Sequence, residues 1–202
     1  MTTSDSGPVR PFKICLETAT YILRTIEASD ATADWANWLL EPTTLKALNA
    51  APLKLDLPTL RDYIATFDGR KSHLLGIFDK TDGTLIGIRA VYIDWHYREF
   101  MVNILIGHTG QRAKGAMRET RDALYHHLFE ERGLEMARAS VLATNSLVNA
   151  YMQADGWQLV LTTLKPAAAG GAMIEVHEYQ MSRDQNRRYE RRRGIFRHAK
   201  AS

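Results

Sequence analysis

One junction constrains this chain more than any other feature. In the stretch "NILIGHTGQRAKGAMRETRDALYHHLF", residues 103–129, an apolar run meets an amphipathic helix. The run is typical of a strand that ends near Gly107, and the helix begins near Gly115 with unpaired first-turn amides and the positive end of its dipole facing outward. Arg112 and Lys114 lie between the strand and the helix, and the junction contains more glycines than the single one that an ordinary connection needs. The junction therefore predicts an anion site suited to a pyrophosphate, and a plain loop with solubilising basic residues is the alternative.

Length and composition indicate a single domain. The chain has 202 residues, of which 45% are hydrophobic, enough for one sizeable core with a short appendage. Its one cysteine, Cys15, excludes an intramolecular disulfide, and no Cys/His spacing suggests a structural zinc. The N-terminal region lacks the apolar segment of a secretion signal, and no run approaches the roughly 20 apolar residues of a membrane span. We therefore expect a cytoplasmic protein without a metal or a membrane anchor.

Basic charge is concentrated at the C-terminal end. Residues 183–200 hold eight lysines and arginines and two acidic residues, a net charge of +6, whereas the whole chain carries +3. The rest of the chain is therefore net acidic, and the pI near 9.0 does not indicate a nucleic-acid-binding face on the folded domain. A solvated, frayed helix is the simpler interpretation of this tail. Binding of an acidic or phosphate-rich partner by the arginines is the alternative.

Hydrophobic periodicity predicts alternating strands and helices. The expected strands cover residues 20–27, 72–94, 97–107, 136–144, 157–165 and 172–181. The expected helices cover residues 30–42, 57–69, 115–131 and 145–154. Within 72–94 the sequence "KTDG" marks a hairpin turn, because Asp82 and Gly83 tolerate the positive φ of such turns, so residues 72–107 should form three adjacent antiparallel strands. The pattern indicates one α+β layered fold with a mixed sheet.

The order of these elements, together with short motifs, resembles the GCN5-related N-acetyltransferase (GNAT) superfamily. The motifs are "RAKGAM" (112–117), "VLATN" (141–145) and "NSLVNAYMQADGWQLV" (145–160). Within the superfamily the chain is most similar to the branch that contains ribosomal-protein N-terminal acetyltransferases and amino-sugar N-acetyltransferases. The resemblance implies a GNAT-type α+β fold, with a mixed, mostly antiparallel central sheet of about seven strands and helices on both faces. It divides the chain into an N-terminal extension (1–20), an acetyl-CoA-binding N-acetyltransferase domain (21–182) and a basic C-terminal tail (183–202).

The resemblance also implies where acetyl-CoA binds. In the family, the amides of a loop with the pattern R/Q-x-x-G-x-G/A hold the pyrophosphate. Arg112 and Gly115 match this pattern, whereas Met117 lies where a small residue is usual. The residues implied for the loop are Arg112, Ala113, Lys114, Gly115, Ala116 and Met117. The backbone donors implied for the pantetheine arm and the thioester carbonyl are Leu105, Ile106 and Gly107.

A second family signature is an asparagine that begins a helix ending in glycine and an aromatic residue, matched here by Asn145 and Gly156–Trp157. The asparagine side chain typically hydrogen-bonds the pantetheine arm, but Asn145 is equally suited to cap the helix. Asn149, one turn later, could assist. Met152 lies where the family often has a tyrosine that protonates the departing CoA thiolate. Tyr151 comes one residue earlier and is either that general acid or a core aromatic, because one residue turns a helical side chain by about 100°.

The implied reaction is direct attack of an amine on the thioester, without a covalent enzyme intermediate. Such a reaction needs a donor for the developing oxyanion and a base for the ammonium proton. The base candidates lie in or after the turn "DWHYRE": Asp94, His96, Glu99 and, through a bound water, Asn103. Histidine is a convenient base near neutral pH, but His96 could equally be an exposed hairpin-tip residue. Trp95 is the aromatic candidate for contact with the acceptor.

These features predict an N-acetyltransferase that moves an acetyl group from acetyl-CoA to a primary amine in a ternary complex, without a metal. An amino sugar, a protein N-terminus and a small amine all fit as acceptors, and a homodimer is compatible with the sequence. The alternative is a catalytically silent acyl-CoA-binding or nucleic-acid-associated module. The displaced tyrosine, Met117 and the arginine-rich tail motivate that alternative.

Overall fold

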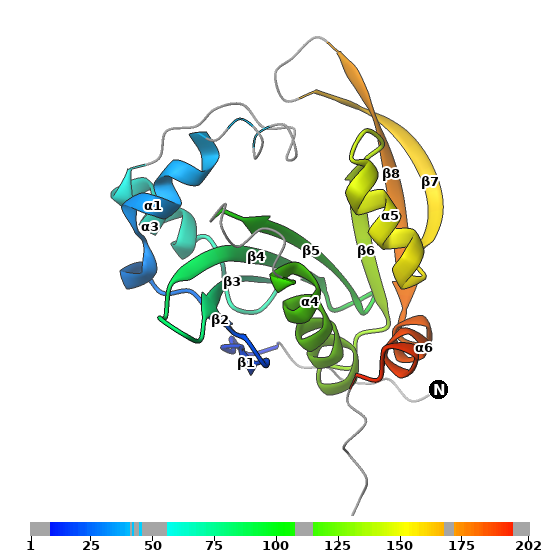
Figure 1. The fold of residues 1–202 in the computed structure, drawn as a ribbon, viewed down its shortest axis with the longest axis horizontal. Helices are drawn as coiled ribbons and strands as arrows, with labels where there is room; N and C mark the ends of the chain where they lie inside the picture. The colour runs from blue at the N-terminus through cyan, green and yellow to red at the C-terminus, as the bar shows by residue number, and fades with distance from the viewer. Residues whose placement is uncertain are drawn as a thin grey trace, which may run out of the picture.

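A single mixed sheet organises the computed structural model, which describes residues 9–40, 42, 45, 56–107, 115–167 and 172–195. The sheet has eight strands in the order β1-β2-β3-β4-β5-β6-β8-β7 (Figure 1). All neighbouring pairs among these strands are antiparallel except β5–β6. The predicted α+β fold with a mixed, mostly antiparallel sheet is therefore confirmed, and the extra strand is β1.

The elements agree closely with the periodicity of the sequence. The strands are β1 (Cys15–Glu17), β2 (Tyr21–Thr25), β3 (Ser72–Asp79), β4 (Leu85–Asp94), β5 (Glu99–Ile106), β6 (Met136–Leu142), β7 (Gln158–Pro166) and β8 (Met173–Ser182). The helices are α1 (Ala33–Asn37), α3 (Leu57–Ala65), α4 (Ala116–His126), α5 (Ser146–Asp155) and α6 (Arg183–Arg193). Short helical turns occur at Ala28–Asp30 and Trp38–Leu40, and a π-helical turn, His127–Glu131, continues α4.

Local chemistry sets where several elements begin and turn. The Asp56 carboxylate caps α3 by accepting from the Thr59 amide at 2.8 Å, and Pro58 fits the first turn of that helix. The expected hairpin turn joins β3 to β4: Gly83 has φ of +74°, and its N–H donates to the Asp79 carbonyl at 2.8 Å. The start of α3 and the turn between β3 and β4 are therefore both determined by residues that are close together in the sequence.

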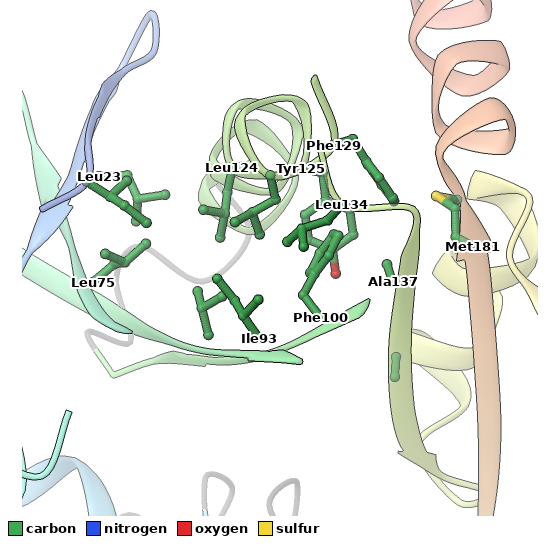
Figure 2. Close-up of a cluster of buried hydrophobic side chains, with 14 of the residues drawn as sticks. Leu23, Leu75, Ile93, Phe100, Leu124, Tyr125, Phe129, Leu134, Ala137 and Met181 are labelled. Carbon is green, nitrogen blue, oxygen red and sulfur yellow. The ribbon is translucent and has the colours of Figure 1, made fainter. Parts of the chain in front are cut away.

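Side chains alternate across the strands, so the sheet has an apolar core on each face. On the face that we call the α4 face, Leu124 and Tyr125 of α4 pack against Leu23, Leu75 and Ile93 of the sheet (Figure 2). On the opposite face, called the α3 face, the core consists of residues from α1, α3 and the sheet, among them Trp35, Trp38, Leu60, Ile64, Leu74 and Ile88. Helices therefore cover both faces. Among the described residues, no helix combines the length and apolar character needed to cross a bilayer.

Both segments that flank residues 21–182 contribute to the packed structure. At the N-terminal side, β1 pairs with β2, and Ile14 just before it belongs to the core of the α4 face. At the C-terminal side, residues that the sequence suggested to be a solvated tail form α6, which packs against α4 and β8. The Ser182 hydroxyl caps α6 through the Gln185 amide. Three residues were too few for β1 to show a periodic signal.

One face of α6 is buried around an arginine of α4. Tyr189 is 2% exposed, and Asn186 and Glu190 are also buried. The Arg121 guanidinium lies between two rings, 4.5 Å from the Tyr125 centroid and 4.3 Å from the Tyr189 centroid. Burial raises the pKa of Tyr189 to about 12. The outer face carries the exposed arginines of the helix: Arg188, Arg191, Arg192 and Arg193. Residues 183–193 of the tail therefore form a docked helix with one solvated face.

We expect Tyr189→Ala to lower the free energy of unfolding by about 3 kcal/mol, because it removes a buried aromatic ring and one side of the Arg121 stack. Arg188→Ala, one residue earlier on the exposed face of the same helix, should change it by less than about 0.5 kcal/mol. Urea denaturation of both variants measures the difference. Equal, small effects would mean that α6 is not docked in solution.

Candidate functional site

The site is built around the parallel strand pair of the sheet. β5 and β6 are joined by three residue pairs: Glu99–Met136, Phe100–Ala137 and Met101–Arg138. Beyond these, β5 continues along β4 to Ile106, whereas β6 continues along β8 to Leu142 (Figure 1). We call the separated parts, residues 102–106 and 139–142, the β5–β6 divergence. The β4–β5 register has no shift, so the divergence does not arise from a bulge in that pair.

Backbone alternation along β5 decides which groups face the divergence. The Gly107 N–H donates to the Ile86 carbonyl of β4 at 3.0 Å, and such hydrogen-bonded positions alternate in an antiparallel pair. Leu105 therefore also bonds to β4, whereas Ile104 turns its N–H and C=O to the side that β6 has left. The amides of Leu105 and Gly107, expected as donors to a ligand, are thus used within the sheet. Ile106 is half-buried and packs against the core of the α4 face.

The glycines at the two ends of the junction are needed for different reasons. A Cβ atom on Gly107 would lie 1.8 Å from an indole carbon of Trp38, so packing excludes any side chain there. Gly115 has open space around it but adopts φ of +87°, a conformation that favours glycine. Gly115 caps α4, and its carbonyl accepts from the amides of Arg118 and Glu119 at 3.0 Å. The first glycine serves packing and the second serves the start of the helix.

The first turn of α4 offers backbone donors. The N–H groups of Ala116 and Met117 have no partner within the helix, because no residue lies one turn earlier in it, and Gly115 at the N-cap has no side chain to bond them. The Ala116 side chain is buried, and Met117, the departure from the small-residue pattern, is half-buried. The other implied loop residues, Arg112, Ala113 and Lys114, lie outside the described residues, so their role stays a prediction.

A buried arginine supports this turn from the sheet. Arg89 of β4 donates from Nε to the Thr120 hydroxyl at 3.0 Å and from Nη2 to the Met117 carbonyl. The Thr120 hydroxyl in turn donates to the Ala116 carbonyl at 2.6 Å. Arg89 is 3% exposed. Sequence reasoning missed it, although a lone arginine inside the apolar run "LIGIRAVYI" was an available signal.

Asn145 and Asn149, both expected near the pantetheine arm, have different environments. Asn145 is half-exposed and caps α5, with Oδ1 accepting from the Val148 amide at 3.2 Å. Its Nδ2 donors have no partner among the described residues, so capping and ligand binding are compatible. Asn145 therefore fits both of the interpretations that the sequence left open.

Asn149 is fully occupied by the protein itself. Its Nδ2 donates to the carbonyls of Leu142 and Asn145, both at 2.9 Å. Its Oδ1 accepts from the Tyr179 hydroxyl and lies 2.9 Å from Nδ1 of His177. A primary amide has two donor hydrogens and two acceptor sites, so none is left for a ligand. The expectation that Asn149 assists cofactor binding is corrected: it fastens β8 to the β6–α5 connection.

Tyr151 and Met152 are adjacent in α5, so their side chains point in different directions and have different surroundings. Met152 packs against the core of the α4 face. Tyr151 is half-buried, and the Arg118 guanidinium lies 5.1 Å from its ring centroid. Arg118 also pairs with Asp155 at 3.2 Å, so this arginine joins the first turn of α4 to α5. Tyr151 is therefore not a core aromatic, and it lies close to the start of α4.

A pocket opens on the α3 face beside the last β5–β6 pair. It measures about 290 Å³ and is lined by Lys71, Tyr92, Ile93, Asp94, Glu99, Phe100, Met101 and Arg138. Glu99 accepts from Arg138 with both carboxylate oxygens, at 2.7 and 2.9 Å, so this ion pair occupies one acceptor site on each oxygen. Asp94 uses Oδ1 for the amides of His96 and Tyr97, and no described residue hydrogen-bonds its Oδ2. Among the described residues, the two pocket carboxylates thus differ in how far they are engaged.

The remaining candidates lie outside this pocket. Asn103 is exposed on the α3 face, two residues beyond Met101 along β5. His96 is exposed at the tip of the β4–β5 turn and packs on Tyr97, with ring centroids 4.7 Å apart. Trp95, expected to contact an acceptor, instead donates from its indole N–H to the Arg70 carbonyl at 2.8 Å and packs near Phe12. It has a structural role in this region.

No group of three or more His, Cys, Asp or Glu side chains in the described part of the chain is placed to hold a metal ion.

We expect Asn149→Ala to reduce the free energy of unfolding by about 3 kcal/mol, because it leaves buried groups of β6 and β8 without partners. Asn145→Ala is the matched control and should cost only about 1 kcal/mol, the usual loss of a helix cap. Chemical denaturation followed by circular dichroism measures both. A smaller loss at Asn149 than at Asn145 would contradict the assignment of Asn149 as the structural amide.

Several solved structures share this fold. Spermidine N-acetyltransferase from Vibrio cholerae, in complex with CoA and spermine, has a TM-score of 0.72 at 15% identity, covering 82% of this chain and 97% of that chain. Ribosomal-protein-S5-alanine acetyltransferase from Vibrio fischeri has a TM-score of 0.70 at 16% identity, covering 85% and 97%. FdhC, a nucleotide-linked sugar GNAT, has a TM-score of 0.69 at 19% identity, covering 91% and 98%.

At the level of sequence, no curated protein matches the chain. The family model described as acetyltransferase (GNAT) domain matches residues 21–158, which is more than half of the 202 residues. That stretch includes the β5–β6 divergence, α4 and α5. The chain therefore belongs to the GNAT acetyltransferase family and is an N-acetyltransferase.

Proposed function

We propose that the protein binds acetyl-CoA across the β5–β6 divergence and transfers its acetyl group to a primary amine held in the pocket of the α3 face. The observation that carries this proposal is the separation of β5 from β6 beside the pocket, and we propose that the cofactor path follows this separation. The path runs from the open first turn of α4, past the backbone of Ile104, to the pocket beside Met101 and Arg138.

The cofactor half of this path follows from donor positions. The amides of Gly115, Ala116 and Met117 suit the pyrophosphate, since a helix N-terminus offers several N–H groups and a favourable dipole. The outward-facing N–H and C=O of Ile104 suit the amide groups of the pantetheine arm. We propose that Asn145 adds a side-chain donor to that arm. Arg112, Ala113 and Lys114 remain proposed members of the pyrophosphate loop.

The acceptor half follows from the position of the pocket. It lies where the two strands begin to separate, so a thioester placed in the divergence can be approached from the α3 face. Transfer then consists of attack by the amine nitrogen on the thioester carbon, with loss of the CoA thiolate and one proton from the nitrogen. Holding both reactants in place supplies much of the rate, and a backbone N–H can stabilise the oxyanion.

We propose Asp94 as the group that receives the proton. Among the pocket carboxylates it has an oxygen that no described residue hydrogen-bonds, whereas Glu99 is held by Arg138. Its Oδ1 is fixed by two backbone amides, which orients the other oxygen. His96 lies outside the pocket lining, and Asn103 remains a candidate for positioning a water beyond Met101.

A general acid is less important than a base in this reaction. A thiolate has a pKa near 8.5, so it departs near neutral pH with little help from a proton donor. Tyr151 stacks on Arg118 near the start of α4, and no described residue hydrogen-bonds its hydroxyl. We propose that it contributes mainly by holding Arg118 beside the cofactor path, which leaves the acid role optional.

The charge of the pocket favours some acceptors over others. Asp94 and Glu99 are balanced by Lys71 and Arg138, so the pocket has no excess negative charge for a polycation. We therefore propose an amino sugar or a protein N-terminus as the acceptor rather than a polyamine. This choice agrees with the branch of the family that the sequence resembles most.

The first experiment asks whether the protein binds and turns over acetyl-CoA. Titration calorimetry with acetyl-CoA and desulfo-CoA measures binding, and thiol release with a panel of amines measures transfer. We expect both binding and release, with amino sugars or short peptides better than spermidine. Binding without release on every amine would instead support the silent acyl-CoA-binding module.

We expect Gly115→Ala to weaken acetyl-CoA binding by at least tenfold, or about 1.4 kcal/mol, because an alanine at φ of +87° displaces the first-turn amides. Gly156→Ala is the matched control: Gly156 has the same φ of +87° but ends α5, away from the proposed path. Both variants should lose similar thermal stability. Equal acetyl-CoA affinities in the two variants would remove the start of α4 from the site.

We expect Asp94→Asn to lower the maximal rate roughly 10²- to 10⁴-fold, the usual scale for loss of a general base, with acetyl-CoA affinity unchanged. Asparagine retains Oδ1, so the turn that Asp94 caps should survive. Glu99→Gln is the control and should reduce the rate less than tenfold. A larger effect at Glu99 than at Asp94 would reverse the assignment.

A further inference from the structure

Arg89 is an unusual residue for the middle of a core strand. It lies in β4 between Ile88 and Ala90, and it is 3% exposed. Among the described residues its guanidinium bonds two neutral groups, the Thr120 hydroxyl and the Met117 carbonyl. No described carboxylate forms an ion pair with it. Burial lowers its pKa to about 10, so the group still carries its charge near neutral pH.

Such a charge is costly to keep. Burying a cation without a carboxylate partner usually costs several kcal/mol, and neutral hydrogen bonds recover only part of that cost. A leucine or methionine at this position would fill the strand without the penalty. The placement therefore calls for a role beyond packing.

The contacts of Arg89 converge on the start of α4. It holds the Met117 carbonyl directly, and it holds the Ala116 carbonyl through the Thr120 hydroxyl, which donates to that carbonyl at 2.6 Å. Both carbonyls belong to the first helical turn. Arg89 is also the register partner of Ile104, the β5 residue whose backbone faces the divergence. The Arg89 side chain thus connects the first turn of α4 to the part of the sheet that contains Ile104, and both lie along the proposed cofactor path.

We infer that Arg89 is a positioning residue for acyl-CoA: it fixes the first turn of α4 relative to Ile104 and places a buried positive charge beneath the amides that face the pyrophosphate. This inference rests on the proposed function. It assigns Arg89 to the phosphate-bearing half of the cofactor and leaves the pantetheine half independent of it.

The two halves can be separated with ligands. CoA and pantetheine differ by the pyrophosphate and the 3′-phosphoadenosine, so the ratio of their dissociation constants reports the contribution of this phosphate-bearing half as a whole. Calorimetry on the full chain gives this ratio for the wild type, for Arg89→Met and for Arg121→Met. Arg121 is the matched control, because it is a buried arginine of α4 that contacts Asp122 and Tyr189 instead of the first turn.

We expect Arg89→Met to weaken CoA binding at least tenfold while changing pantetheine binding less than threefold. Arg121→Met should lower thermal stability and leave the ratio unchanged. Equal losses for both ligands in Arg89→Met, or an unchanged ratio, would overturn the inference and leave Arg89 with a purely structural role.

Two further results keep the test decisive. If Arg89→Met does not fold, Thr120→Val removes one of the two links while keeping the charge, and it should weaken CoA about threefold with pantetheine unaffected; an unchanged ratio there overturns the inference. If the wild type binds no CoA, the proposed function fails, and this inference fails with it. If the wild type binds CoA but the variants keep the wild-type ratio of dissociation constants, this inference fails and the proposed function stands.

Discussion

The change from antiparallel to parallel pairing between β5 and β6 is the constraint on which the site depends. A parallel neighbour cannot be reached by a tight turn, so the chain must cross over, and α4 is the crossover helix. This places the start of α4 next to the end of β5. Because only three residue pairs join β5 to β6, the strands separate on the side where that helix begins. One topological step therefore creates both the opening and its anion-binding helix end.

The fold was largely predictable because its signals are local. The hairpin at Asp82–Gly83 and the start of α4 at Gly115 each depend on a few adjacent residues whose φ preferences are strong. Hydrophobic periodicity then located most strands to within a few residues. β1 and the docked face of α6 were missed for opposite reasons. β1 is too short to show a period, and the many arginines of α6 obscured the inward-facing Tyr189.

The site was predictable in outline but not in detail. Motif spacing brought attention to Gly115 and Asn145, which the structure places at the starts of α4 and α5. Spacing could not reveal that Asn149 is saturated by β8, or that Gly107 is required by Trp38 from a distant helix. Both depend on tertiary contacts, which bring together groups that are far apart in the sequence. Arg89 was missed because the sequence does not show that its guanidinium meets the Thr120 hydroxyl and the Met117 carbonyl, two neutral groups.

Trp38 gives the architecture a further property. Its indole is buried in the core of the α3 face, yet it rests against the backbone of Gly107, where β5 ends before α4. Protein interiors are close-packed, so the ring cannot shift without moving that peptide. The packing of the turn that follows α1 therefore fixes the position of the peptide at which β5 ends.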